Sequence, residues 1–242
     1  MKQLLIGFLI VVTFGLSCSS PPYSHMAKTT DEHLSNNLQR DSFVQIRSKV
    51  SIRSCAAGLC VTRTERFVGS GFVVKKTSNG SFIMTAGHIC HDPRESATHV
   101  LSHIVVDLSG EIYEAISLIR DLENDMCLMH AKGLTNRPPI PLARRAPEPG
   151  EKLYNLAAPA GIFGVNMVPI IHGHYNGEDE GRAIYSVPAA GGSSGSVVLN
   201  SNFEVVGMIH SVHMRFPVIT IGPTFKKLKD FIDQNTKRFS NL

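Results

Sequence analysis

The sequence predicts an all-β protein of two packed six-stranded antiparallel β-barrels with a short C-terminal α-helix. Short apolar runs typical of strands follow one another, separated by turn residues, in two series on either side of a proline-rich segment at 135–151. The last stretch, 223–239, begins at a proline and has helical periodicity. Its apolar positions are Phe225, Leu228, Phe231 and Ile232.

The composition is that of a globular protein with a sizeable core. The chain has 242 residues, of which 43% are hydrophobic, and its formal net charge is +4. Basic residues gather only in "TFKKLKDF" and "LARRA", which are short enough to belong to a solvated surface. We therefore expect no nucleic-acid partner.

The first series of strand-like runs forms an N-terminal lobe, which we expect over residues 42–135. Its runs lie at 43–53, 60–68, 71–76, 82–87, 98–108, 112–120 and 126–131. The sequence "SNG" between the third and fourth runs is a hairpin turn signal.

The second series forms a C-terminal lobe, expected over 136–242 together with the terminal helix. Its runs lie at 152–158, 165–176, 183–189, 196–200, 204–213 and 218–222. The proline-rich segment between the two series is then the crossover from one lobe to the other.

The N-terminus is typical of an export signal, expected over residues 1–18. Lys2 precedes an apolar run at 4–16, which is too short to span a bilayer comfortably and is closed by small residues. The sequence "GLSC" resembles a bacterial lipoprotein cleavage site, which makes Cys18 a candidate for lipidation; a plain export signal is the alternative. Residues 19–41 are polar and aperiodic, as in a flexible linker. We expect an exported protein, in the periplasm, the cell envelope or outside the cell, with membrane contact only through a lipid on Cys18.

Five cysteines fit an exported protein, because four remain to pair if Cys18 carries lipid. Cys55 and Cys60 flank the short connection "AAGL" and are predicted to form a disulfide that clips a hairpin. Cys90 and Cys127 would be the second pair, but both lie in apolar segments, where buried free thiols are also common. No Cys/His spacing resembles a zinc site, so no metal is expected.

The uncharged stretch "GGSSGSVV" at 191–198 has two interpretations. It is an ordinary loop, or it is a tight turn that directs backbone N–H groups at a ligand and holds a serine for reaction. A serine nucleophile needs a histidine base, a carboxylate that orients the base, and N–H donors for the oxyanion. His88 follows the compact turn "TAG" at the end of a strand, and Asp125 opens a buried strand, where a charge needs partners. Asp121 is the rival carboxylate, but it lies in a polar lead-in.

Three motifs in the order His, Asp, Ser carry a family resemblance: "GSGFVV…TAGH", "NDMCLM" and "GSSGSVV". Over about residues 43–232 the chain resembles the trypsin/chymotrypsin-like serine protease family, nearest in style to its bacterial glutamyl endopeptidase and HtrA-like branches. The resemblance implies a chymotrypsin-like fold and a serine endopeptidase. Such an enzyme cleaves protein or peptide substrates through an acyl-enzyme intermediate, with no cofactor.

The resemblance also implies the role of each site residue. His88 would be the general base, Asp125 its orienting partner, and Ser194 the nucleophile, since the reactive serine of the family precedes a glycine. Ser193 is the alternative nucleophile, one residue out of this register. The N–H groups of Gly192 and Ser194 would form the oxyanion hole.

Substrate specificity is expected from the residues before the nucleophile and the strand after it. Ala189 and His210 are the candidate pocket residues. The absence of an Asp at 187–191 argues against a preference for Lys or Arg. His210 lies one residue out of register with the histidine by which glutamyl endopeptidases read an acidic side chain; a structural or surface histidine is the alternative, and His213 is a weaker candidate.

A function of a different class remains open. The chain would then be a catalytically silent protease-like domain that serves as a binding or structural module in the cell envelope. Such domains have usually lost a triad residue, whereas all three are present here.

Overall fold

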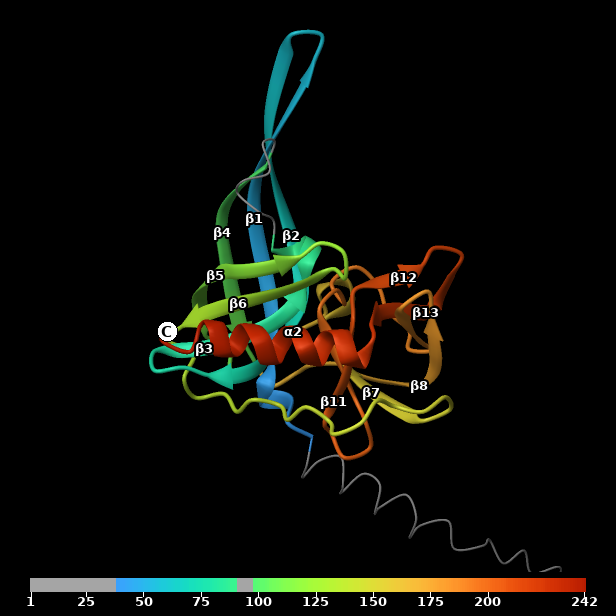
Figure 1. Ribbon diagram of the computed structural model, residues 1–242. Coiled ribbons are helices and arrows are strands. Elements are labelled where there is room, and N and C mark those ends of the chain that lie inside the picture. Colours follow the sequence, from blue (N-terminus) through green and yellow to red (C-terminus); the bar gives the residue numbers. More distant parts are fainter. Residues whose placement is uncertain (1–37, 91–97) are drawn as a thin grey trace, which may run out of the picture. The chain divides into compact units, whose positions relative to one another are not determined.

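A computed structural model describes residues 38–90 and 98–242, and it consists mostly of antiparallel strands with one α-helix. The predicted signal peptide, Cys18 and nearly all of the predicted linker lie outside these residues. Six strands form a closed barrel in the order β1-β2-β3-β6-β5-β4 (Figure 1). They are β1 (Phe43–Ala56), β2 (Leu59–Lys76), β3 (Gly80–Ala86), β4 (Thr98–Asp107), β5 (Ile112–Asp121) and β6 (Met126–Lys132).

Seven predicted runs gave six strands because β2 joins two of them. The separator, Gly69-Ser70, lies inside the strand and is buried, as is Gly71, the first residue of the next predicted run. A Cβ atom at Gly69 or Gly71 would lie 2.9 Å from the side chain of Ile89 or Ile83. These glycines therefore serve close packing within a continuous strand and do not end it.

The second lobe contains a seven-stranded sheet in the order β11-β10-β7-β8-β9-β13-β12. Its strands are β7 (Lys152–Leu156), β8 (Ile170–Asp179), β9 (Arg182–Tyr185), β10 (Ser196–Leu199), β11 (Val205–Ile209), β12 (Ser211–His213) and β13 (Phe216–Pro223). The two edge strands, β11 and β12, are separated in the chain by His210 alone. One predicted run thus supplies both ends of the sheet, which explains why six runs gave seven strands.

The C-terminal helix α2 (Phe225–Arg238) confirms the helix predicted from periodicity. Thr224 caps it by accepting a hydrogen bond from the Lys227 N–H. Its apolar face buries Phe225, Leu228, Phe231 and Ile232. Because α2 contacts both β11 and β6, it covers a boundary between the sheet and the barrel (Figure 1).

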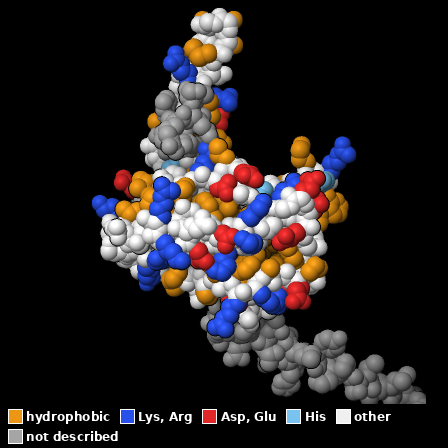
Figure 2. Space-filling view, in the orientation of Figure 1, with side chains coloured by type: hydrophobic (Ala, Val, Ile, Leu, Met, Phe, Trp, Pro, Cys, Tyr) orange, Lys and Arg blue, Asp and Glu red, His pale blue; other side chains and the backbone are white. Residues whose placement is uncertain are grey.

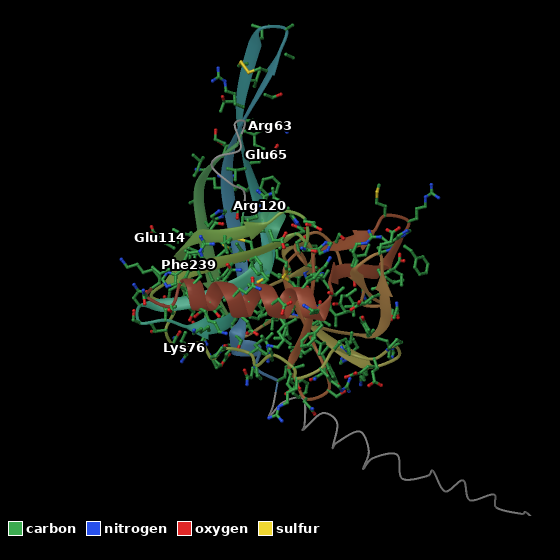
Figure 3. The ribbon with its side chains drawn as sticks, in the orientation of Figure 1. Arg63, Glu65, Lys76, Glu114, Arg120 and Phe239 are labelled. Carbon is green, nitrogen blue, oxygen red and sulfur yellow. A yellow bond between two sulfur atoms is a disulfide. The ribbon has the colours of Figure 1, made fainter. Side chains whose placement is uncertain are left out.

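The hairpin of β1 and β2 extends well beyond the barrel (Figure 1). Figure 2 shows hydrophobic side chains at its tip, where Leu59 and Val61 are exposed, and Figure 3 shows Arg63 and Glu65 further down the same arm. The predicted Cys55–Cys60 disulfide is present at the tip. No helix within 38–90 and 98–242 combines the length and apolar character that crossing a bilayer requires.

Candidate active site

His88 lies directly after β3, in the short 3₁₀ turn η2 (Gly87–Ile89). Two links hold this turn to the start of β6. The Gly87 N–H donates to the Asp125 carbonyl at 2.9 Å, and a disulfide joins Cys90 to Cys127. The second pair that the sequence left open is therefore formed. It ties the chain two residues after His88 to the chain two residues after Asp125.

Asp125 holds His88 through two hydrogen bonds. Its Oδ1 accepts from the His88 backbone N–H at 2.7 Å, and its Oδ2 accepts from His88 Nδ1 at 2.8 Å. An ionised carboxylate can only accept, so Nδ1 carries the proton and Nε2 is left as the basic nitrogen. This is the tautomer that a general base requires, and the ring is 45% exposed, so it is open to a substrate.

The environment of Asp125 keeps its side chain ionised. Burial raises the pKa of Asp125, but the hydrogen bonds and charge of His88 outweigh it, and the net pKa lies below the ordinary value. Asp121, the rival, accepts from the N–H groups of Glu123 and Asn124 in its own turn. The structure thus brings Asp125, and not Asp121, to His88.

The serine stretch forms two successive turns that each need a glycine. The Ser193 N–H donates to Ala190 O, and the Ser196 N–H donates to Ser193 O, both at 2.9 Å. Gly192 (φ +97°) and Gly195 (φ +87°) occupy the third position of the two turns. A type II turn requires positive φ at that position, where glycine is least strained. The stretch therefore consists of two tight turns, and the reactive role of a serine within them stays a prediction.

The two serines are distinct in exposure. Ser193 is buried, and its Oγ accepts a hydrogen bond from the Ala190 N–H within the turn. Ser194 is partly exposed, and its Oγ donates to the His210 carbonyl at 3.5 Å. Among the described residues, no hydrogen bond joins Ser194 Oγ to the His88 ring. Of the two hydroxyls, that of Ser194 is the one open to a ligand.

The backbone around Ser194 is oriented by its carbonyl groups. The Gly191 carbonyl accepts from the Ala160 N–H at 2.6 Å, and the Ser193 carbonyl accepts from Ser196. In a trans peptide the C=O and N–H groups point in opposite directions. The N–H groups of Gly192 and Ser194 therefore point away from these contacts, as two donors of an oxyanion hole would.

Ser70 links the two lobes at the site, a role not predicted from the sequence. Its Oγ donates to Gly192 O at 2.8 Å and accepts from the Ala158 N–H at 3.0 Å. Its own N–H donates to Ser194 O at 2.8 Å. The sequence feature that could have indicated this role is a single polar residue between two glycines, next to an apolar strand segment. Such a serine, when buried, needs several backbone partners.

The glycine after Ser194 brings the serine turn against the end of β3. A Cβ atom at Gly195 would lie 2.2 Å from Ser70 O and 2.9 Å from the Ala86 N. Because Ala86 is two residues before His88, the serine turn packs against the chain just before the histidine turn.

The remaining predicted residues lie in the second lobe. Ala189 packs partly buried against the core of the sheet, and its N–H donates to Pro217 O. The His210 ring lies beside the Asp125 carboxylate, with 3.7 Å between Nδ1 and Oδ2. No cluster of His, Cys, Asp and Glu suited to a metal ion occurs within the described part of the chain.

Comparison with known proteins places these motifs in a family. Residues 69–208, more than half of the chain, match the trypsin-like peptidase domain. No curated protein matches the sequence. Among solved structures, the serine endoprotease from Yersinia pestis has a TM-score of 0.63 at 17% identity, over 85% of this chain and 65% of that one. Rv3671c from M. tuberculosis H37Rv, an inactive serine-to-alanine mutant, has a TM-score of 0.61 at 16% identity, over 86% of this chain and 92% of that one. At such identities the likeness shows a shared fold.

Proposed function

Because this chain belongs to the trypsin-like peptidase family, we propose that it is a serine endopeptidase that hydrolyses protein or peptide substrates. The observation that carries the proposal is the 2.8 Å hydrogen bond between His88 Nδ1 and Asp125 Oδ2, next to the turn that exposes Ser194. A base in the right tautomer, a hydroxyl and two N–H donors are the parts that acyl transfer needs.

The reaction begins with attack of Ser194 Oγ on the scissile carbonyl carbon, while His88 Nε2 takes the hydroxyl proton. The oxyanion accepts hydrogen bonds from the N–H groups of Gly192 and Ser194. The intermediate collapses when the peptide C–N bond breaks and His88 returns the proton to the leaving amine. Water then attacks the acyl-enzyme with the same base, releasing the acid and restoring Ser194.

Asp125 fixes the ring of His88 and stabilises the imidazolium that forms in each step. Its carboxylate stays ionised, because its pKa is held below the ordinary value by the hydrogen bonds of His88 against the effect of burial. We propose that rotation about χ1, a staggered torsion with three low-energy positions, turns the Ser194 hydroxyl from the His210 carbonyl to Nε2. Catalytic hydrogen bonds of this kind are often long without substrate and shorten when it binds.

Export is also part of the proposal, to the envelope or the outside of the cell. The two disulfides support it, since such bonds persist in oxidising compartments. A lipid on Cys18 stays a prediction from the sequence, because that residue lies outside the described part.

The alternative, a silent protease-like module, has one observation in its favour: the Ser194 hydroxyl bonds to the His210 carbonyl and not to His88. Hydrolysis of casein, an unstructured protein substrate, separates the two. We expect the wild type to cleave it, Ser194→Ala to lose at least about a thousandfold in kcat, and Ser193→Ala to keep most of the activity. Folded wild type that cleaves no faster than Ser194→Ala would contradict the enzyme and support the module.

A further inference from the structure

Residues 47–68 form the outer part of the β1–β2 hairpin, called the arm below (Figure 1). β1 pairs with β4 only as far as Ile52, whereas its pairing with β2 continues without a break to the pair Ala56 and Leu59. The Cys55–Cys60 disulfide joins the two strands next to the turn. The end of the arm is therefore a cross-linked ribbon that pairs with no other strand within 38–90 and 98–242.

The arm has one strongly basic face. Cross-strand partners in a hairpin lie on the same face, and successive residues alternate between the two faces. The register therefore places four exposed cations on one face, called the basic face: Arg47, Lys49, Arg53 and Arg66. The carboxylate of the arm, Glu65, lies on the opposite face, where it pairs with Arg63 at 2.8 Å. The basic face thus carries positive charge that no carboxylate of the arm neutralises.

The tip of the arm is apolar. Leu59 is 76% exposed and Val61 is 65% exposed, and both lie on the face opposite the basic face. Figure 2 shows hydrophobic side chains at the tip and basic side chains below them. Removing such aliphatic surface from water lowers the free energy, so the tip is stabilised wherever a partner covers it.

We propose that the arm docks on an anionic lipid surface, with the tip among the upper acyl chains and the basic face at the headgroups. Interfacial binding of this kind combines buried apolar area with attraction of basic side chains to anionic lipids, and the arm offers both. The proposal goes beyond the proposed function and does not depend on it, because the proposed catalytic residues lie outside the arm. It adds a membrane contact within the described residues to the one that the sequence predicts at Cys18.

The length of the tip fits this orientation. Leu59 and Val61 span about 7 Å of strand at roughly 3.3 Å per residue, and interfacial side chains enter about 5–10 Å deep. Arg53 lies one residue pair behind Val61 and is therefore at the level of the headgroups. Lys49 and Arg66 lie farther back, and their long side chains reach toward the surface. Only the tip enters the lipid, because the strand edges behind it carry unpaired backbone groups that need water.

The charge of the basic face favours a membrane over a second copy of the chain. A two-fold contact places identical surfaces against each other. If the basic face took part in such a contact, its four cations would meet the same four cations of the partner and be repelled by them. An anionic lipid surface attracts all of them.

Tryptophan fluorescence tests the docking of the tip directly, because the sequence contains no tryptophan. Leu59→Trp in the full chain places a single indole at the tip. With vesicles of equimolar phosphatidylglycerol and phosphatidylcholine, we expect its emission to shift to shorter wavelength as the indole leaves water. With vesicles of phosphatidylcholine alone, we expect no shift. Ile112→Trp is the matched control, since Ile112 is 60% exposed and lies at the end of the barrel away from the arm; its emission should not shift.

Charge variants in the Leu59→Trp background separate the basic face from the net charge. Each basic side chain near an anionic surface strengthens binding about fivefold, so Arg53→Gln with Arg66→Gln should weaken vesicle binding about 25-fold. Arg53→Lys with Arg66→Lys should bind like the parent, because the headgroups attract either cation. Lys226→Gln with Lys237→Gln removes the same charge from α2, where both side chains are exposed, and should leave binding unchanged.

Thermal unfolding and fluorophosphonate labelling, which reports an activated serine without a known substrate, verify that each variant keeps its fold and its proposed site. No shift of a folded Leu59→Trp protein on anionic vesicles, or an equal shift on neutral ones, would overturn the proposal. Equal weakening by the arm and helix variants would do the same. A shift that needs no lipid and grows with protein concentration would assign the tip to a second copy of the chain instead. A folded chain that binds vesicles but does not label would contradict the proposed function and leave this proposal intact.

Discussion

Gly191 and Gly192 are neighbours in the serine turn with opposite tolerance for a side chain. A Cβ atom at Gly192 would lie 2.4 Å from the Ala158 carbonyl oxygen, and its φ of +97° is one that other residues rarely adopt. A Cβ atom at Gly191 would meet nothing within 4 Å. Only Gly192 supplies an N–H group of the proposed oxyanion hole. A glycine is therefore needed at this position for both a steric and a catalytic reason.

The contrast between Gly191 and Gly192 gives a prediction about single substitutions. Gly192→Ala should shift the turn and lower the fluorophosphonate labelling rate by about 100-fold or more, the usual effect of losing one oxyanion donor. Gly191→Ala should label at the wild-type rate, because its side chain enters open space. Thermal unfolding of both variants shows whether the fold is kept. A Gly192→Ala protein that is folded and as reactive as Gly191→Ala would exclude this N–H from the oxyanion hole.

Among the secondary-structure elements, the β4–β5 hairpin is held in place by one buried carboxylate. Asp107 is fully buried and accepts from the N–H groups of Ser109 and Glu111 and from both Nε and Nη2 of Arg137. Burial raises the pKa of Asp107, but the bonds from Ser109 and Arg137 outweigh it and leave the pKa below the ordinary value. Arg137 belongs to the segment after β6, so this pair fastens the crossover segment to the barrel.

Asp107→Asn should lower the free energy of unfolding at pH 7 by about 3 kcal/mol, because it removes the buried counter-charge of Arg137 and leaves only the exposed Asp41 carboxylate, 3.7 Å away. The folded-state pKa is lower than the unfolded one. The stabilisation by Asp107 is therefore complete above the unfolded value of about 3.9 and is lost as the pH falls through the folded pKa. We expect urea unfolding to give a smaller difference in the free energy of unfolding between wild type and Asp107→Asn at pH 3 than at pH 7.

Asp121→Asn is the control for this prediction. The Asp121 carboxylate accepts hydrogen bonds within its own turn and has no arginine partner among residues 38–90 and 98–242, so its loss should cost no more than about 1 kcal/mol. If the free energies of unfolding of wild type and Asp107→Asn differ by the same amount at pH 3 and pH 7, the assigned charge state of Asp107 is contradicted.

The sequence predicted most elements, but it divided one strand into two runs and merged two strands into one run, for physical reasons. Gly69 and Ser70 separated two predicted runs, yet tertiary packing of Gly69 against Ile89 keeps this part of the chain inside β2. His210 lies in an unbroken apolar run, yet the chain passes from one edge of the sheet to the other at this residue. Both outcomes depend on partners distant in sequence, which local periodicity does not contain.

On the scale of the whole molecule, the candidate site is assembled from both lobes. The barrel supplies His88 and Asp125, the sheet supplies Gly192 and Ser194, and Ser70 of the barrel bonds to the serine turn of the sheet. The order of the three motifs predicted one site made of His88, Asp125 and Ser194, and the structure brings Asp125 to His88. The place of His210 beside Asp125 and the role of Ser70 were not predictable, because both arise from contacts across the two lobes.

The proposed triad is tested most directly by fluorophosphonate labelling of the folded chain, followed by peptide mapping of the modified residue by mass spectrometry. We predict one adduct, on Ser194, that forms in the wild type and in Ser193→Ala and is absent in His88→Ala. Labelling should also disappear when the chain is unfolded in urea, since the base and the serine come from different lobes. An adduct on Ser193, an adduct that persists without His88, or no adduct on the folded wild type would contradict the proposed triad.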